Sequence, residues 1–293
     1  MAFDRWFRIS LAALVLAFGA AFARAQDDPD DAGDDSAEPY AWQGVLQYDW
    51  TAQAHASATS GLSFNSTYSF GDSGSSLGVG VSSTSQKVEG VRVGDGSLSL
   101  SGVWGLGDWT PNVSLSTGHA AGGLNTRSVD LGLDWVFQDP FSVTLTGGYG
   151  TQRHVAPTAV LLSLPANALT NVEGELFSHS ESLGLSFGWQ ALDKLGFSAG
   201  YTRSWDVTDK VENRAHNAEK QLNQRGWTNT LALGGQWTLG NHWSLGFSGN
   251  GGKQYSPGLG FYNTRTGVTS TTQAPSKTDF YGAGASLSYS FNL

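Results

Sequence analysis

Carboxylate and amide side chains recur in segments of this sequence where apolar and small polar residues alternate. Successive side chains of a β-strand point to opposite faces, so each of these polar groups falls on the face opposite to its apolar neighbours. Six such residues are candidates for a polar site: Gln43, Gln47, Asp49, Asp130, Asp134 and Asp206. No ladder of Lys or Arg shares their face, so the set disfavours polyanions and suits neutral polar solutes or a weak cation preference. The acids could equally serve only to keep this face wet.

A second candidate chemistry is hydrolysis by a serine that a histidine activates, because His-x-Ser places both side chains on one face of a strand. This spacing occurs at His55-Ala56-Ser57 and, at a turn, at His242-Trp243-Ser244. No third residue that would orient the histidine can be assigned. Lipid hydrolysis of the phospholipase or deacylase type therefore ranks only as an alternative function. With no Cys, one Met and no His/Asp spacing typical of a metal site, the sequence predicts neither a metal nor a cofactor.

The N-terminus has the features of a secretory signal peptide. Arg5 and Arg8 precede an apolar stretch over residues 9–22, which is followed by Ala23-Arg24-Ala25. A basic start, a short apolar run and an A-x-A site are the three parts of such a peptide, and the run is short for a membrane-spanning helix. We therefore predict that residues 1–25 are a signal peptide cleaved after Ala25. The absence of Cys suits an oxidising compartment.

The next segment, residues 26–39, is strongly acidic. It contains seven Asp and Glu residues and almost nothing apolar to bury, so we predict that it is disordered. The whole chain carries a formal net charge of −9, which argues against a nucleic-acid partner because such partners require clustered Lys and Arg.

From residue 40 to residue 293 the chain alternates with a period of two. Residues 227–239 show the pattern most clearly, with Trp227, Leu231, Leu233 and Trp237 on one face and small polar residues on the other. The same template predicts about twelve strands, at residues 42–54, 60–70, 76–85, 95–106, 109–119, 126–138, 141–153, 178–191, 194–207, 226–239, 242–256 and 278–291. Tight turns alternate with longer connections, and no change in composition marks a second domain.

Two architectures could place apolar residues on one face only: a soluble β-sandwich and a transmembrane β-barrel. The strands are long, and the polar face is Ser, Thr, Gly, Asn and Gln, whereas an exposed soluble sheet would use Lys and Glu. Only 14% of the residues are charged. From Trp227 to Trp237 a tilted strand would span ~25 Å, the height of the apolar band between two aromatic girdles. We therefore predict an all-β fold, an antiparallel up-and-down transmembrane β-barrel over residues 40–293.

The chain ends Tyr289-Ser290-Phe291-Asn292-Leu293. This alternation resembles the C-terminal signature of Gram-negative outer-membrane β-barrels, although Leu293 stands where the usual terminal aromatic residue would be. The resemblance is to the superfamily and selects no single family. It implies a multi-pass barrel in the outer membrane, contact with membrane lipid and lipopolysaccharide, and recognition of the last strand by the barrel-assembly machinery.

The predicted lumen is lined mainly by small residues, which favours a porin-like passive channel for small polar solutes. Loop 154–177 carries an apolar cluster that could fold inward as a constriction: Val160, Leu161, Leu162 and Leu164. Loop 208–225 is charged and could form a short surface helix or contact lipopolysaccharide. Besides the hydrolase, the remaining alternative is a closed structural barrel whose loops bind a partner. The sequence predicts no particular oligomeric state.

Overall fold

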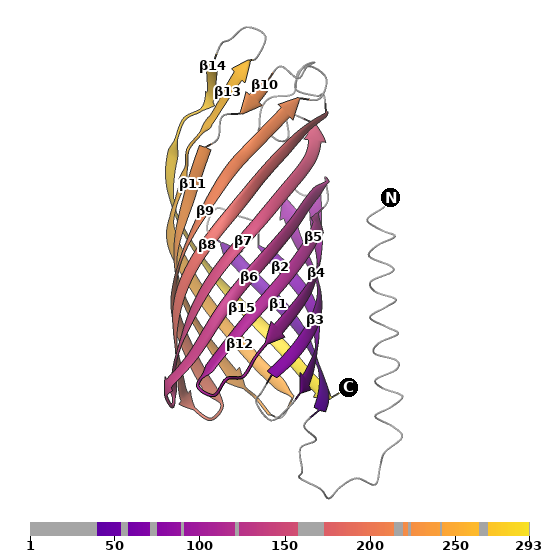
Figure 1. The fold of residues 1–293 in the computed structure, drawn as a ribbon, viewed down its shortest axis with the longest axis vertical. Helices are drawn as coiled ribbons and strands as arrows, with labels where there is room; N and C mark the ends of the chain where they lie inside the picture. Colours follow the sequence, from indigo (N-terminus) through magenta and orange to yellow (C-terminus); the bar gives the residue numbers. More distant parts are fainter. Residues whose placement is uncertain are drawn as a thin grey trace, which may run out of the picture.

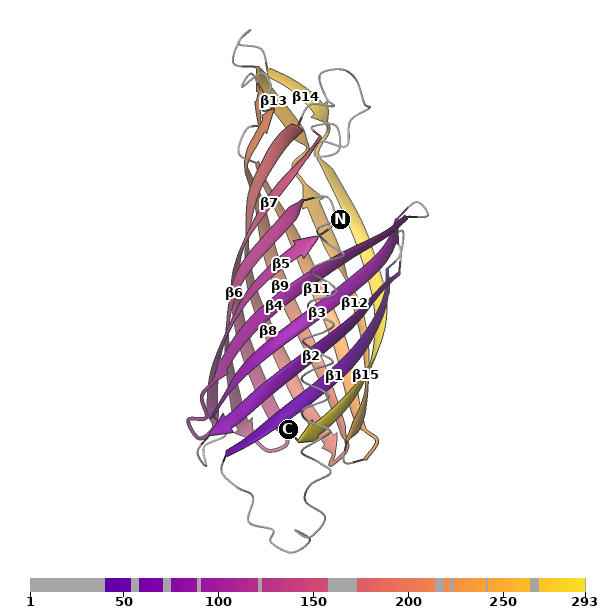
Figure 2. The same ribbon diagram turned by 90° about the vertical axis from the view of Figure 1, so that its right-hand side faces the viewer.

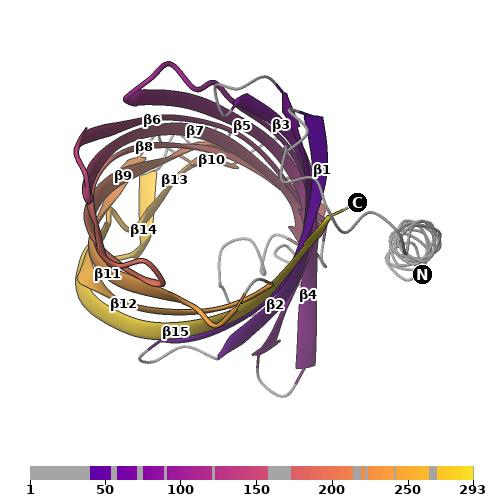
Figure 3. The same ribbon diagram turned by 90° about the horizontal axis from the view of Figure 1, so that it is seen from below.

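Twelve strands form a closed ring in the computed structural model (Figures 1 and 3). The structure describes residues 40–53, 58–70, 75–88, 91–120, 123–157, 173–213, 219–221, 224–240, 242–263 and 269–292. The ring strands are β1 (Tyr40–Gln53), β2 (Thr59–Phe70), β3 (Ser75–Val88), β4 (Val91–Val103), β5 (Trp109–Ala120), β6 (Leu124–Gln138), β7 (Phe141–Pro157), β8 (Glu173–Leu192), β9 (Leu195–Asn213), β11 (Gln224–Thr238), β12 (Trp243–Ser256) and β15 (Ser276–Asn292).

Every pairing in this ring is antiparallel, and each strand pairs with its neighbours along the chain. The sheet passes from β1 to β9, continues through β11 and β12 to β15, and closes where β15 pairs with β1. The predicted up-and-down barrel of about twelve strands is confirmed. Closure matters physically because a membrane has no water to satisfy the backbone groups of an open sheet edge.

Three short strands were not predicted: β10 (Glu219–Gln221), β13 (Leu259–Asn263) and β14 (Thr269–Gln273). They pair in the order β9-β10-β13-β14 beyond one end of the ring. The suggested short helix in loop 208–225 is wrong for the described residues, since β9 continues to Asn213 and β10 follows. Backbone pairing continues between β8 and β9 as far as Gly174 and Asn213, past the point where the apolar alternation stops, with a one-residue shift in register between Phe177 and Ser178.

The barrel wall has unequal height. The strands β7, β8 and β9 have 17, 20 and 19 residues, whereas β2 and β5 have 12 each. Figure 2 shows the wall of β7–β9 rising above the wall of β1–β5 at the end away from the C-terminus. The short connections lie at the opposite end, which by the general rule for these barrels faces the periplasm.

Apolar side chains cover the outside of the barrel. Among the described residues Ala120 alone is a buried hydrophobic residue, while Leu231, Leu233 and Tyr281 are each about two-thirds exposed, at 65%, 68% and 66%. A sandwich would bury such side chains between its sheets, so this distribution selects the membrane barrel. No helix among the described residues is long and apolar enough to cross a membrane.

Aromatic rings mark both borders of the apolar band. Near the short connections Trp109 stacks on Trp135 with centroids 5.1 Å apart, and Trp243 packs against Tyr289 at 4.8 Å. Near the other border Trp227 stacks on Tyr255 at 5.9 Å. Trp and Tyr sit at the headgroup level because their rings are apolar at one end and polar at the other.

Some sequence predictions fall outside the described residues. They are the signal peptide over residues 1–25 with cleavage after Ala25, the acidic segment over residues 26–39, and the last residue of the C-terminal signature, Leu293.

Candidate functional site: the lumen of the barrel

The inner face of the wall encloses a cavity of about 780 Å³ in the half of the barrel near the short connections. Gln47 and Asp49 on β1 line it, together with Gln190 on β8 and Gln236 on β11. Nε2 of Gln47 donates a hydrogen bond of 2.6 Å to Oδ1 of Asp49. The amide thereby orients the carboxylate on the cavity wall.

A second group of acids lies on β6. Asp134 accepts hydrogen bonds from Nδ2 of Asn112 on β5 at 3.0 Å and from Oγ1 of Thr144 on β7 at 2.5 Å. Asp130, four residues along the same strand, accepts one from Oγ of Ser128 at 3.1 Å. Neutral hydroxyl and amide donors thereby orient both carboxylates on the inner face.

The other candidates lie at the two ends of the lumen. Gln43 is opposite Thr67 near the start of β1, on the side of the short connections. Asp206 on β9 is opposite Ser180 and Gly226, toward the far end. The sequence prediction missed Asp95 on β4, which shares its face with Ser97 and Ser99 and lies 3.5 Å from Oγ1 of Thr84. Asp95 lies two residues before Ser97, and this spacing could have identified it as an inward-facing residue.

Small side chains form the rest of the inner face. Hydroxyl groups pair across neighbouring strands, as in Ser82 with Ser97 at 2.7 Å and Ser244 with Ser288 at 2.6 Å. Gly148 lies between a carboxylate oxygen of Asp130 and the hydroxyl of Ser182, in a space that a Cβ would fill. Such a wall leaves room inside the barrel and offers hydrogen-bonding groups to a solute.

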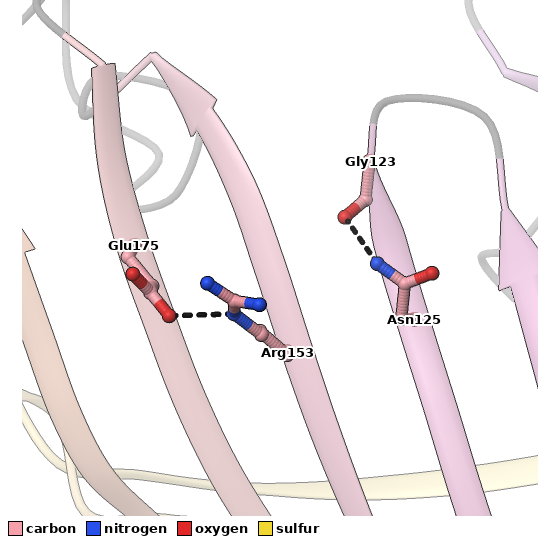
Figure 4. A network of polar contacts seen from close by, with 4 residues as sticks. All are labelled: Gly123, Asn125, Arg153 and Glu175. Atoms are coloured by element: carbon pink, nitrogen blue, oxygen red, sulfur yellow. Dashed lines mark hydrogen bonds and ion pairs between the residues drawn. The ribbon is translucent and has the colours of Figure 1, made fainter.

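The charged strand residues on the inner face are of one sign. Among the strand residues whose side chains the structure describes, the charged ones directed inward are all aspartates: Asp49, Asp95, Asp130, Asp134 and Asp206. Lys194 borders the cavity from a turn. The arginines of these strands face outward, as Figure 4 shows for Arg153, whose Nε lies 2.6 Å from Oε1 of Glu175 beside Asn125 and Gly123. The inner surface is thus acidic, whereas the outer surface carries the bases together with the acids Glu175, Glu181 and Asp279.

The histidines with described contacts do not form a hydrolytic pair with serine. Nδ1 of His242 lies 2.9 Å from the backbone oxygen of Ser290, and its ring packs on Tyr289, whereas Ser244 bonds to Ser288. His179 stacks on Tyr149 on the outer face, opposite in direction to Ser180. The other His-x-Ser spacing, at residues 55–57, lies outside the described residues, as do the constriction candidates Val160, Leu161, Leu162 and Leu164.

No group of three or more His, Asp or Glu side chains able to hold a metal ion is found in the part of the chain that the structure describes.

Comparison with solved structures identifies the fold. An outer-membrane channel from Pseudomonas putida F1 is 10% identical, with a TM-score of 0.51 over 91% of this chain and all of the other. The NanC porin has a TM-score of 0.46 at 12% identity, covering 82% of this chain and 98% of its own. The KdgM porin, solved in complex with disordered oligogalacturonate, has a TM-score of 0.44 at 13% identity, covering 84% and 99%. No protein-family model and no curated protein matches the sequence.

A closed antiparallel barrel with apolar side chains outward and a polar interior is the architecture of Gram-negative outer-membrane β-barrels. The chain folds as a closed twelve-strand barrel of this architecture.

Proposed function

We propose that this barrel is a passive, porin-like channel for small polar solutes that are neutral or weakly cationic. The observation that carries the proposal is the inner face, where small hydroxyl-bearing residues and glycines surround aspartates without a basic strand residue among the described side chains. The likeness of the fold to an outer-membrane channel supports the same class of function.

The candidate residues have distinct roles in this proposal. Gln43 and Gln47 offer amide groups that replace water around a polar solute. The four aspartates first singled out, Asp49, Asp130, Asp134 and Asp206, raise the local concentration of cations and repel anions, as acidic rings do in cation-preferring pores. Polyanions are disfavoured for the same reason. Val160, Leu161, Leu162 and Leu164 are proposed to narrow the passage.

Planar-bilayer recording of the folded full-length barrel tests this function. We expect stepwise conductance. In a KCl gradient, we expect a reversal potential whose sign shows that K⁺ passes more readily than Cl⁻. Asp130→Asn combined with Asp134→Asn removes two lumen charges, so the reversal potential should move toward zero. Arg127→Gln, on the outer face of β6, is the matched control and should leave it unchanged. Absence of conductance in both the wild type and a variant lacking residues 156–168 would contradict the channel.

A pair of adjacent substitutions tests whether solute passes through the cavity. Ser248 on β12 lines it from the inside, and Phe247 points outward beside it. For a twelve-strand barrel with a bore on the order of 10–14 Å, Ser248→Trp should lower single-channel conductance by about half or more. Phe247→Trp places the same indole on the lipid side, in place of a ring already there, and should leave conductance near that of the wild type. Equal conductance in the two variants would argue against this path.

A further inference from the structure

Two arginines and two tryptophans form a cluster on the outer, lipid-facing surface of β9 and β11. Trp205 and Trp227 are direct cross-strand partners, and Arg203 and Arg225 each lie two residues from a tryptophan on the same face. We call these four residues the Arg–Trp cluster. Since ~25 Å of tilted strand separates Trp227 from Trp237 near the short connections, the cluster lies at the border of the apolar band on the outer-leaflet side.

The rings hold both guanidinium groups in place. Cζ of Arg203 lies 5.3 Å from the ring centroid of Trp205 and 5.6 Å from that of Trp227. Cζ of Arg225 lies 5.3 Å from the centroid of Trp205. These are cation–π distances, and they fix two positive groups around one ring. The cluster is therefore ordered before any ligand arrives, which lowers the entropy cost of binding one.

The cluster carries more positive charge than its surroundings neutralise. Nη2 of Arg225 forms an ion pair with Oε2 of Glu181 on β8 at 3.2 Å, and the two side chains are 57% and 47% exposed. Arg203 has no ion pair within the described part of the chain, and its Nε is buried there without a hydrogen-bond partner. An arginine at the border of a hydrocarbon layer is costly unless an anion meets it.

We propose that the Arg–Trp cluster binds a phosphate group of the phosphorylated glycolipid, lipid A, in the outer leaflet. A guanidinium presents a planar fork of donors that matches phosphate oxygens, and the cluster offers two such forks, one on each arginine. The tryptophan rings seat the apolar part of the same lipid at headgroup depth. The phosphate group would come from a membrane lipid and not from a soluble ion, because the cluster faces the membrane and not the lumen.

Binding of purified lipid A to the folded, detergent-solubilised full-length barrel tests the site, followed by native mass spectrometry and tryptophan fluorescence. Arg203→Gln combined with Arg225→Gln should weaken binding of diphosphorylated lipid A about tenfold or more, the scale of losing charged hydrogen bonds. Arg127→Gln combined with Arg153→Gln is the matched control. It removes two outward arginines, one of them paired to an acid, from β6 and β7, and should bind within about twofold of the wild type.

Two further measurements use the wild-type barrel and so do not depend on the folding of a variant. Wild-type barrel should bind dephosphorylated lipid A at least about tenfold more weakly than the diphosphorylated form. Millimolar inorganic phosphate should not displace the lipid. Equal binding by both arginine-pair variants, equal binding of both lipid forms, or displacement by inorganic phosphate would each overturn the proposal. Heat-modifiable electrophoretic mobility reports that each variant is folded.

Discussion

Leu231→Arg is expected to lower the free energy of unfolding by about 2–4 kcal/mol, the cost of arginine near the middle of the lipid-facing surface of a barrel. Leu231 lies on β11 between Trp227 and Trp237, and the residue is 65% exposed on the outside of the ring. An arginine there would have to bring its charge into hydrocarbon or bend toward a headgroup.

Ala232→Arg is the control for this prediction, because the adjacent side chain points into the lumen opposite Gly200 and Asn250. Its effect on unfolding should be less than about 1 kcal/mol, since a charge there remains in water. Urea unfolding of both variants in lipid vesicles measures the difference. If Ala232→Arg were the more destabilising of the two, the inside and outside of the wall would be assigned wrongly.

Gly252→Ala should destabilise the barrel by about 1–3 kcal/mol, the usual cost of overpacking. A Cβ at Gly252 on β12 would overlap the backbone carbonyl of Asn229 on β11, and Cζ of Phe280 on β15 is 3.0 Å away. The carbonyl belongs to a hydrogen-bonded ladder and cannot turn aside, so the two strands would have to separate locally.

Gly249→Ala, three residues away on the same strand, provides the comparison. The nearest atom to a Cβ there is the backbone oxygen of Gly282 at 4.0 Å, and the new methyl group faces outward. It should leave the urea midpoint unchanged or slightly raised, since alanine restricts the unfolded chain. A midpoint for Gly252→Ala equal to that of Gly249→Ala would show that β11 and β12 are less closely packed than in this structure.

The fold was predictable because alternate residues of each strand face the lipid and the lumen, and the two environments require different side chains. Leu231 and Leu233 face lipid and Ala232 faces the lumen, so the period-two pattern itself carries the direction of each side chain. The same logic identified Asp130 and Asp134 as inward residues. Where both faces of a strand meet water the pattern ends, although the pairing does not. That is why the outer parts of β8 and β9, and the short strands β10, β13 and β14, were not recognised.

The Arg–Trp cluster was only half visible in the sequence. Arg203-Ser204-Trp205 and Arg225-Gly226-Trp227 each place an arginine and a tryptophan on one face of a strand. The two motifs come together through the register of β9 against β11, in which Trp205 lies opposite Trp227. A long connection joins these strands, and such a connection does not fix register as a tight hairpin turn does.

The unequal wall has a geometric consequence for the outer mouth. The eight-residue difference between β8 and β2 corresponds to about 20 Å of height for strands tilted by ~40°, across a barrel about 24 Å wide. The aperture is therefore an oblique section of a cylinder, inclined by roughly 40° and wider in area than the bore by a factor of about 1.3. Its normal leans toward the side of β1–β5, so the upper edge of the described strands faces sideways on that side (Figure 2).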